Sequence, residues 1–233
     1  PTTFEFTDIT GLVKGASKGE GLGNQFLGNI RECDAIIHVL RCFDNGNIVH
    51  VDGSVNPVRD KEIIDTELQL KDLETVENRI KKVEKLANVG GDKQAKIELG
   101  VLTAYKDALE QGQSARTVSF DTEDEITAAK SLFLLTTKPV LYVCNVDDAS
   151  AANGNTYVDA VREAIKDENA QLLIISAQTE SDIAELETYE EKQMFLEDMG
   201  LAESGCNRLI KAIYSLLNLE TFITAGEMEV KAW

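Results

Sequence analysis

Three short apolar runs alternate along the chain with longer stretches of helical periodicity. The runs are rich in Val, Ile and Leu and occupy residues 34–40, 138–146 and 170–176. Nearly continuous apolar runs of this length are typical of strands that are buried on both faces, as in a parallel sheet. A fourth segment, residues 2–7, alternates apolar and polar positions, which predicts a strand with Phe4 and Phe6 on one face.

Helical periodicity fills the intervals between these strands. Apolar residues recur at steps of three and four, and they predict helices over residues 24–33, 124–135, 156–167 and 207–217. Strands that alternate with helices are the signature of an α/β fold built on a mostly parallel sheet. The last residues, FITAGEMEVKAW, have the composition of a further β element.

The interval between the second and third predicted strands differs in composition and periodicity from the rest of the chain. Residues 60–88 are highly charged and contain neither Gly nor Pro. The seam of a coiled coil is predicted there by residues at alternating steps of three and four, namely Leu73, Val76, Ile80, Val83 and Ala87. A turn, NVGGDK, and a second helical stretch over 94–111 follow, so the pattern predicts an inserted antiparallel helical hairpin. It either projects from the α/β core as an arm or packs on its own domain as a solvated helix.

Charge narrows the range of partners. The sequence has 23 Lys and Arg residues against 41 Asp and Glu residues, a net charge of −18. This balance argues against a general nucleic-acid coat, because counterion release needs a basic surface. A local basic patch remains between Arg79 and Lys85. No apolar run approaches the roughly 20 residues that span a bilayer, and no basic stretch followed by an apolar one opens the chain, so we expect a cytoplasmic protein without a membrane partner.

The cysteines indicate a reducing compartment. Their spacing contains no C-x-x-C pair, and the four residues are Cys33, Cys42, Cys144 and Cys206. Because the spacing of metal ligands is absent and most of them lie in apolar or helical stretches, the sequence predicts buried free thiols.

A D-x-x-G motif marks the end of the first predicted strand. Asp8 and Gly11 are its fixed positions, and five glycines lie between residues 11 and 23. In nucleotide-dependent switches, such an aspartate holds Mg²⁺, usually through water, and the glycine N–H approaches the γ-phosphate closely. The following loop orders when that phosphate is present. The tetrapeptide alone is weak evidence, and a mobile loop without catalytic meaning is its plain alternative.

Two further motifs lie at the ends of later strands. Asn145 ends the third apolar run and Asp148 follows three residues on, while Ser176 and Ala177 follow the last run. Guanine-specific switches carry N-K-x-D at the first place, where the Asp accepts two hydrogen bonds from the base. Val146 replaces the Lys, so it supplies only part of the contact that the Lys stem makes with the base. An Asx turn is the alternative for the first motif. The order of all three motifs at strand ends favours a nucleotide site.

The glycine-rich segment and its neighbours resemble a known family. DITGLVKGASKGEGLGNQFLGNIRECDAIIHVLRCF is similar to the switch II segment of the YchF family, the Obg-like ATPases within the TRAFAC class of P-loop NTPases. NIVHVDGSVNPVRDKEIIDTELQLKDLETVENRI resembles the segment that leads into the helical arm of the family. FITAGEMEVKAW resembles the start of its C-terminal TGS domain. The similarity spans essentially the whole chain.

The resemblance implies a fold and a set of boundaries. It implies an incomplete G-domain-like α/β fold: residues 1–66 and 118–218 form the nucleotide domain, 67–117 the coiled-coil arm, and 219–233 the start of the TGS domain. No G-x-x-x-x-G-K-[ST] occurs in the 233 residues, and in the family this loop precedes the matching segment. We therefore expect a fragment that lacks the P-loop and most of the TGS domain, and that does not itself hydrolyse nucleotide.

The resemblance also implies an activity. The family hydrolyses ATP in preference to GTP with Mg²⁺, and its partners are the ribosome and the translation machinery, with RNA a candidate for the groove between arm and TGS domain. Carried onto this sequence, Asp8 would hold Mg²⁺ through water and Gly11 would meet the γ-phosphate. Asn145, Val146, Asp148, Ser176 and Ala177 would form the base site. Leu12 occupies the position of the Gln that orients water in many GTPases, so another group must do this.

Two other hypotheses remain open at this point. A helical-hairpin scaffold or adaptor with a relic nucleotide fold would show substitutions such as Leu12 and Val146. A GTPase of the broader Obg type is disfavoured by Val146. Two measurements separate the three hypotheses. One is hydrolysis by the full-length protein, and the other is competition between ATP and GTP for binding to it.

Overall fold

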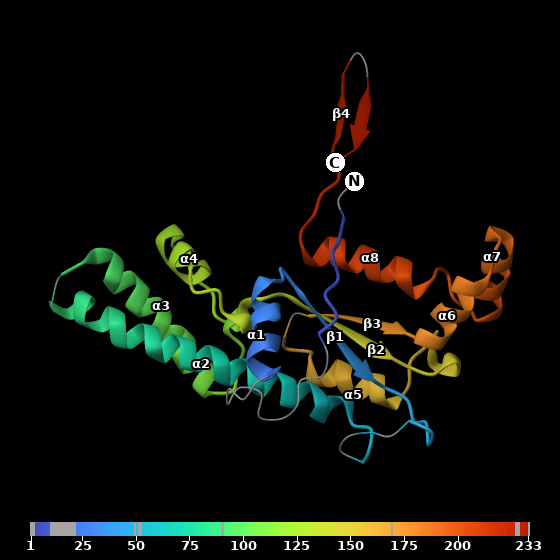
Figure 1. Cartoon of the computed structure of the whole chain (residues 1–233), viewed down its shortest axis with the longest axis horizontal. Helices are drawn as coiled ribbons and strands as arrows, with labels where there is room; N and C mark the ends of the chain where they lie inside the picture. Colours follow the sequence, from blue (N-terminus) through green and yellow to red (C-terminus); the bar gives the residue numbers. More distant parts are fainter. Residues whose placement is uncertain are drawn as a thin grey trace. The chain divides into compact units, whose positions relative to one another are not determined.

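The computed structural model describes residues 3–9, 22–48, 50, 53–89, 91–168, 170–226 and 229–232 (Figure 1). The chain divides into two compact units. The sheet unit comprises residues 1–8, 37–57 and 140–233, and the helical unit comprises residues 9–36 and 58–139. The further division into nucleotide domain, arm and TGS domain stays a prediction.

A parallel sheet forms the centre of the sheet unit. Its strands are β1 (Ile36–Arg41), β2 (Val140–Asn145) and β3 (Gln171–Ile175), in the order β1-β2-β3. β2 and β3 are parallel, with Asn145 opposite Ile175. The backbone N–H of Cys42 donates to the carbonyl of Asn145 at 2.7 Å, and that of Ile36 to Pro139 at 3.0 Å, so β1 runs in the same direction. The three apolar runs thus form the predicted parallel strands.

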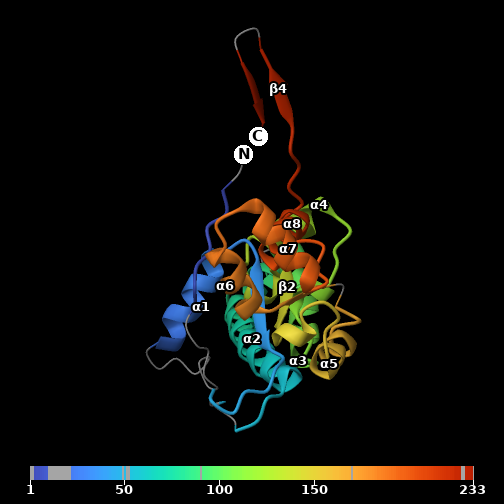
Figure 2. The same ribbon diagram turned by 90° about the vertical axis from the view of Figure 1, so that its right-hand side faces the viewer.

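Helices cover both faces of this sheet. The two helices on the faces are α8 (Gly205–Leu216) and α5 (Thr156–Ala164), and the unit also contains α6 (Ala177–Glu185) and α7 (Tyr189–Asp198). The amphipathic α8 contacts β2 and β3, and its Ala212 and Ile213 share an apolar cluster with Leu141 and Val143. Figures 1 and 2 show α5 on the opposite face. The C-terminal segment forms a hairpin of β4 (Ile223–Ala225) and β5 (Val230–Ala232), as its composition predicts.

The predicted first strand is wrong. The structure assigns no strand to residues 3–9, and the side chain of Phe6 is 59% exposed. Phe4 is half-buried because its ring meets that of Tyr214 edge to face, with the centroids 5.0 Å apart. A strand needs a neighbour that accepts its backbone hydrogen bonds, and no strand within the described residues pairs with this segment. The alternation therefore reflects one aromatic contact rather than a sheet face.

The helical unit is built around the predicted hairpin. It contains α1 (Leu22–Glu32), α2 (Pro57–Val89), α3 (Lys93–Glu110) and α4 (Glu123–Lys130), with short 3₁₀ turns η2 (Ala115–Thr117) and η3 (Leu135–Thr137). The seam residues of α2 pack against α3 in one core, which includes Val76, Val83, Ala87, Val101 and Leu102. Gly91 has a left-handed φ of 62° in the turn, and the Asp92 side chain caps α3 by accepting from two backbone N–H groups.

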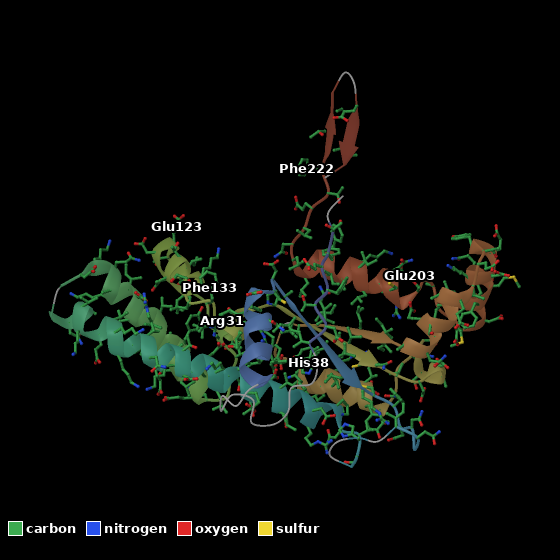
Figure 3. The ribbon with its side chains drawn as sticks, viewed as in Figure 1. Arg31, His38, Glu123, Phe133, Glu203 and Phe222 are labelled. Atoms are coloured by element: carbon green, nitrogen blue, oxygen red, sulfur yellow. The ribbon has the colours of Figure 1, made fainter. Side chains whose placement is uncertain are left out.

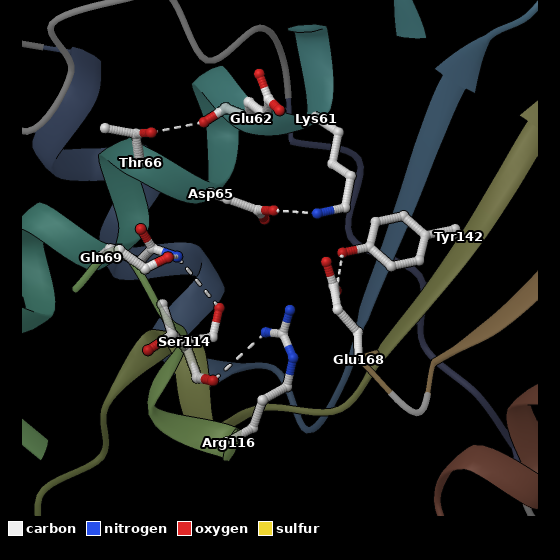
Figure 4. A network of polar contacts seen from close by, with 11 residues as sticks. Lys61, Glu62, Asp65, Thr66, Gln69, Ser114, Arg116, Tyr142 and Glu168 are labelled. Carbon is white, nitrogen blue, oxygen red and sulfur yellow. Dashed lines mark hydrogen bonds and ion pairs between the residues drawn. The ribbon is translucent and has the colours of Figure 1, made fainter. Parts of the chain in front are cut away.

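A buried carboxylate fixes the segment that follows α4. Asp72 of α2 is 0% exposed, and it accepts hydrogen bonds from the backbone N–H of Leu135 at 2.8 Å and of Thr136 at 2.7 Å. The Thr136 hydroxyl donates a third bond at 2.7 Å. Burial raises the pKa of Asp72, and the hydrogen bonds from Thr136 and Leu135 oppose that rise. Figure 4 shows a second link from α2, the bond from Gln69 to Ser114.

This arrangement explains why the predicted helix over 124–135 is too long. α4 ends at Lys130, and Phe133 takes a left-handed φ of 49°. A helix that continued to Leu135 would give the N–H groups of Leu135 and Thr136 intrahelical partners, whereas the structure turns them toward Asp72. The tertiary hydrogen bonds thus override the local periodicity.

Candidate functional site

The carboxyl ends of the three strands meet around Asn145. Asn145 is the last residue of β2, and its backbone carbonyl accepts from Cys42, which directly follows β1. Its side-chain Oδ1 accepts a hydrogen bond of 3.0 Å from the backbone N–H of Ala177, which opens α6 after β3. Parallel α/β sheets bind ligands at this edge. The structure therefore brings together two of the predicted motifs at the expected place.

Asp148 lies beside these residues and presents a carboxylate to solvent. Its Oδ1 accepts hydrogen bonds from the hydroxyl of Ser176 at 2.6 Å and the hydroxyl of Thr179 at 2.7 Å. The Asp148 side chain is exposed, whereas Ser176 and Thr179 are buried. The hydrogen bonds from Ser176 and Thr179 lower the pKa of Asp148 below its ordinary value. At neutral pH the group is therefore an ionised acceptor of hydrogen bonds.

Val146 differs from its neighbours in the motif. Its side chain is only 3% exposed, and its backbone N–H donates to the carbonyl of Ile175 at 3.0 Å. The side chain thus belongs to the interior, and the backbone of Val146 extends the β2–β3 ladder by one bond. Its predicted contact with a base stays a prediction.

The D-x-x-G motif is described only at its first position. Asp8 has an exposed carboxylate, and Gly11 and Leu12 lie outside the described residues. Within the part of the chain that the structure describes, no three His, Cys, Asp or Glu side chains gather into a metal cluster. A single exposed carboxylate suits an ion that keeps most of its water, as Mg²⁺ does.

Thr179 is a site residue that the sequence motifs did not single out. It is 1% exposed and lies in the first turn of α6, where its N–H is capped by the hydroxyl of Ser176 at 3.2 Å. The available signal was the capping position: a Ser before a helix places the residue three positions later beside the cap. The bond from its hydroxyl to Asp148 depends on how η4 (Asp148–Ser150) lies against α6, which no local pattern encodes.

Comparisons with known proteins agree with this geometry. A family model described as 50S ribosome-binding GTPase matches residues 1–82. The ribosome-binding ATPase YchF of Bacillus subtilis (strain 168) is 55% identical over 235 residues, which cover all of this chain and 63% of that protein. The protein of the same name from Escherichia coli O157:H7 is 52% identical over 233 residues, again all of this chain and 63% of the relative. The chain belongs to the YchF family.

A solved structure supports the fold of this YchF family member. The structure of the Schizosaccharomyces pombe YchF GTPase aligns with a TM-score of 0.81 at 34% identity, over 97% of this chain and 61% of that one. The fold is therefore the α/β fold of P-loop GTPases with an inserted pair of helices. The chain spans 63% of the length of the curated relatives named above.

No helix in the described residues of this YchF-family chain is both long enough and apolar enough to cross a membrane.

The four cysteines of this YchF-family chain are free thiols, in accord with the sequence. Cys42 and Cys144 are buried beside Asn145, whereas Cys33 is only half-buried and Cys206 is exposed, so the prediction of burial is wrong for Cys206 and only partly met for Cys33. Cys206 lies in the first turn of α8, on the side away from the sheet that the amphipathic pattern leaves in solvent.

Thiol labelling should separate these cysteines. We expect a water-soluble disulfide reagent to modify Cys206 promptly in the folded protein, and Cys42 and Cys144 only after unfolding. The hydrogen bond with Cys144, and then burial, also raise the pKa of Cys42, which disfavours its reactive thiolate. Mass spectrometry of labelled peptides gives the rates. Equal labelling of Cys42 and Cys206 in the native state would contradict the structure.

Proposed function

We propose that the protein is a nucleotide-dependent switch that hydrolyses ATP to ADP and phosphate, with GTP as a weaker substrate. The observation that carries this proposal is the meeting of Asn145, Asp148, Ser176 and Ala177 at the carboxyl edge of the sheet. These residues offer an exposed anionic acceptor, the carboxylate of Asp148, where a purine base would lie. The names of the relatives, ribosome-binding ATPases, support the reaction class.

Most of the roles that this reaction requires fall to named groups of this chain. Asp148 would accept a hydrogen bond from the base, and Asn145 would hold the α6 loop in place through its bond to Ala177. Asp8 would hold Mg²⁺ through water, and the ion when bound neutralises charge on the phosphates. Gly11 would place its N–H at the γ-phosphate. Leu12 carries no group that orients water, so we propose that a backbone or another side chain does this.

We further propose that the protein works in the cytoplasm on the ribosome. The relatives carry ribosome binding in their names, and the family model is that of a 50S ribosome-binding GTPase. Two elements are not part of the proposed base site: the helical unit, which has its own core, and the β4–β5 hairpin. These elements would signal to a partner which nucleotide is bound. Contact with RNA near the predicted arm and TGS domain is the finer part of this proposal.

Phosphate release tests the activity. We expect the full-length protein with Mg²⁺ to hydrolyse ATP slowly, and unlabelled ATP to compete better than GTP. Because no G-x-x-x-x-G-K-[ST] occurs in these 233 residues, we expect them alone to bind ATP weakly and to release no phosphate. Micromolar binding of ATP to the 233 residues in isothermal titration would contradict that second expectation. No hydrolysis by the full-length protein would instead favour a helical scaffold with a relic nucleotide fold.

A further inference from the structure

Purine bases differ in how many acceptors they require from a carboxylate. The Watson–Crick edge of guanine carries two neighbouring donors, N1–H and the N2 amino group, and a carboxylate binds both when each of its oxygens is available. Adenine carries one donor group on that edge, the N6 amino group, so one acceptor oxygen is enough. The number of free lone pairs on the Asp148 carboxylate therefore determines which purine base it can bind.

One oxygen of Asp148 is already occupied from within the protein. Each carboxylate oxygen has about two lone-pair sites. Both sites of Oδ1 are taken by the hydroxyls of Ser176 at 2.6 Å and Thr179 at 2.7 Å. Both hydroxyl bonds end on Oδ1, the backbone N–H of Thr179 makes a weaker interaction with the same carboxylate, and the side chain is exposed. One acceptor atom is therefore left for a ligand.

The backbone donor that guanine would need is occupied as well. The O6 atom of guanine is an acceptor and requires an N–H from the loop that follows β3. The N–H of Ala177 is donated to Oδ1 of Asn145 at 3.0 Å. Adenine has an amino group instead of O6, so it makes no demand on this N–H. The two occupied groups disfavour guanine independently and leave adenine unaffected.

We propose that the hydroxyls of Thr179 and Ser176 determine the purine preference, by occupying one oxygen of Asp148 and so preventing it from pairing with both donors of guanine. This inference rests on the proposed function, because it assumes that a purine nucleotide binds at this edge of the sheet. It differs from the effect of Val146, which removes a stem over the base and weakens contact with either purine. Thr179 is a specificity-determining residue on this proposal, and it acts through Asp148.

The burial of the two hydroxyl residues makes the arrangement rigid. Thr179 is 1% exposed and Ser176 is 2% exposed, so neither hydroxyl is free to turn to water when a base arrives. Ser176 also accepts from the N–H of Thr179, which fixes its hydroxyl proton toward Asp148. Buried hydroxyls that lost this acceptor would be left unsatisfied. A guanine base would therefore have to displace bonds that the fold itself needs.

The first experiment needs no substitution. Dissociation constants of ATP, GTP and inosine triphosphate are measured for the full-length protein with Mg²⁺ by isothermal titration. Hypoxanthine differs from guanine only in lacking the N2 amino group. If Asp148 offers one acceptor, GTP and inosine triphosphate bind within about twofold of each other, and ATP binds more tightly than both. A preference for GTP over inosine triphosphate of about tenfold or more would overturn the inference.

Substitutions give the second experiment. Thr179→Val keeps the shape of the buried side chain and removes its hydroxyl, so Oδ1 regains a lone pair. We expect the affinity ratio of GTP to ATP, and that of GTP to inosine triphosphate, each to rise about fivefold to tenfold. Thr179→Ser restores the hydroxyl and should restore the original ratios. The matched control is Thr156→Val, the same chemical change at an exposed position in α5 of the same unit.

The outcomes separate the two proposals. Wild-type protein that binds ATP more tightly than GTP, together with a Thr179→Val variant of unchanged ratios, overturns the role of Thr179 and leaves the proposed function intact. Wild-type protein that binds no nucleotide, or that prefers GTP, overturns both. A Thr179→Val variant that does not fold leaves the comparison of GTP with inosine triphosphate in the wild type as the deciding measurement.

Discussion

Replacement of Asp8 by Asn in the full-length protein is expected to reduce ATP hydrolysis by at least about a hundredfold, the usual scale for loss of one charged contact to a transition state. The substitution keeps the size of the side chain and removes its negative charge. On the proposed function, that charge holds the hydrated Mg²⁺ at the phosphates. Steady-state phosphate release at saturating ATP gives the rate.

The same segment offers a matched control for this experiment. Glu5 is a second exposed carboxylate within residues 3–9, and Glu5→Gln should hydrolyse ATP at the wild-type rate. A higher Mg²⁺ concentration should restore part of the activity of Asp8→Asn if the loss lies in holding the ion. Wild-type hydrolysis by Asp8→Asn would contradict the assignment of Asp8 and with it the proposed switch.

Replacement of Asp72 by Ala is expected to lower the free energy of unfolding by about 3–4 kcal/mol. The substitution leaves two backbone N–H groups and one hydroxyl, at Leu135 and Thr136, without their buried acceptor. It also removes the link that turns the chain after α4 toward the start of β2. Urea denaturation followed by circular dichroism measures the change.

Asp107 provides the control for Asp72. It is an exposed aspartate on α3 of the same helical unit, and Asp107→Ala should change the unfolding free energy by less than about 0.5 kcal/mol. Equal destabilisation by the two substitutions would show that Asp72 contributes no more than a surface charge. The hydrogen bonds of its carboxylate would then not be the reason that α4 ends at Lys130.

Hydrophobic periodicity correctly predicted the strands and helices that are stabilised by burial of their apolar side chains. The run at 138–146 became β2 (Val140–Asn145), and the residues at steps of three and four in α2 became its buried side. Prediction failed where one tertiary contact overrode the local pattern. Residues 3–9 have an alternation but no strand partner among the described residues, and the stretch after Lys130 has helical periodicity but donates its N–H groups to Asp72.

The candidate site shows the same division between contacts that the sequence predicts and contacts that it does not. The rule that strand ends gather at one edge placed Asn145 near Ala177 without any knowledge of the fold. The two hydroxyl bonds to Oδ1 of Asp148 could not be predicted, because they depend on the rotamers of Ser176 and Thr179 and on how η4 meets α6. Side-chain hydrogen bonds between distant segments leave no periodic trace in a sequence.

Asn145 joins all three strands, since its carbonyl accepts from Cys42 and its side chain accepts from Ala177. A mutagenesis study of this residue would therefore mix two effects, weaker ligand affinity and a loosened scaffold. Binding constants for Asn145 variants become interpretable only after correction for the fraction of molecules that remain folded at the assay temperature. Variants of Asp148 need the same correction, because they would leave the buried hydroxyls of Ser176 and Thr179 without their acceptor.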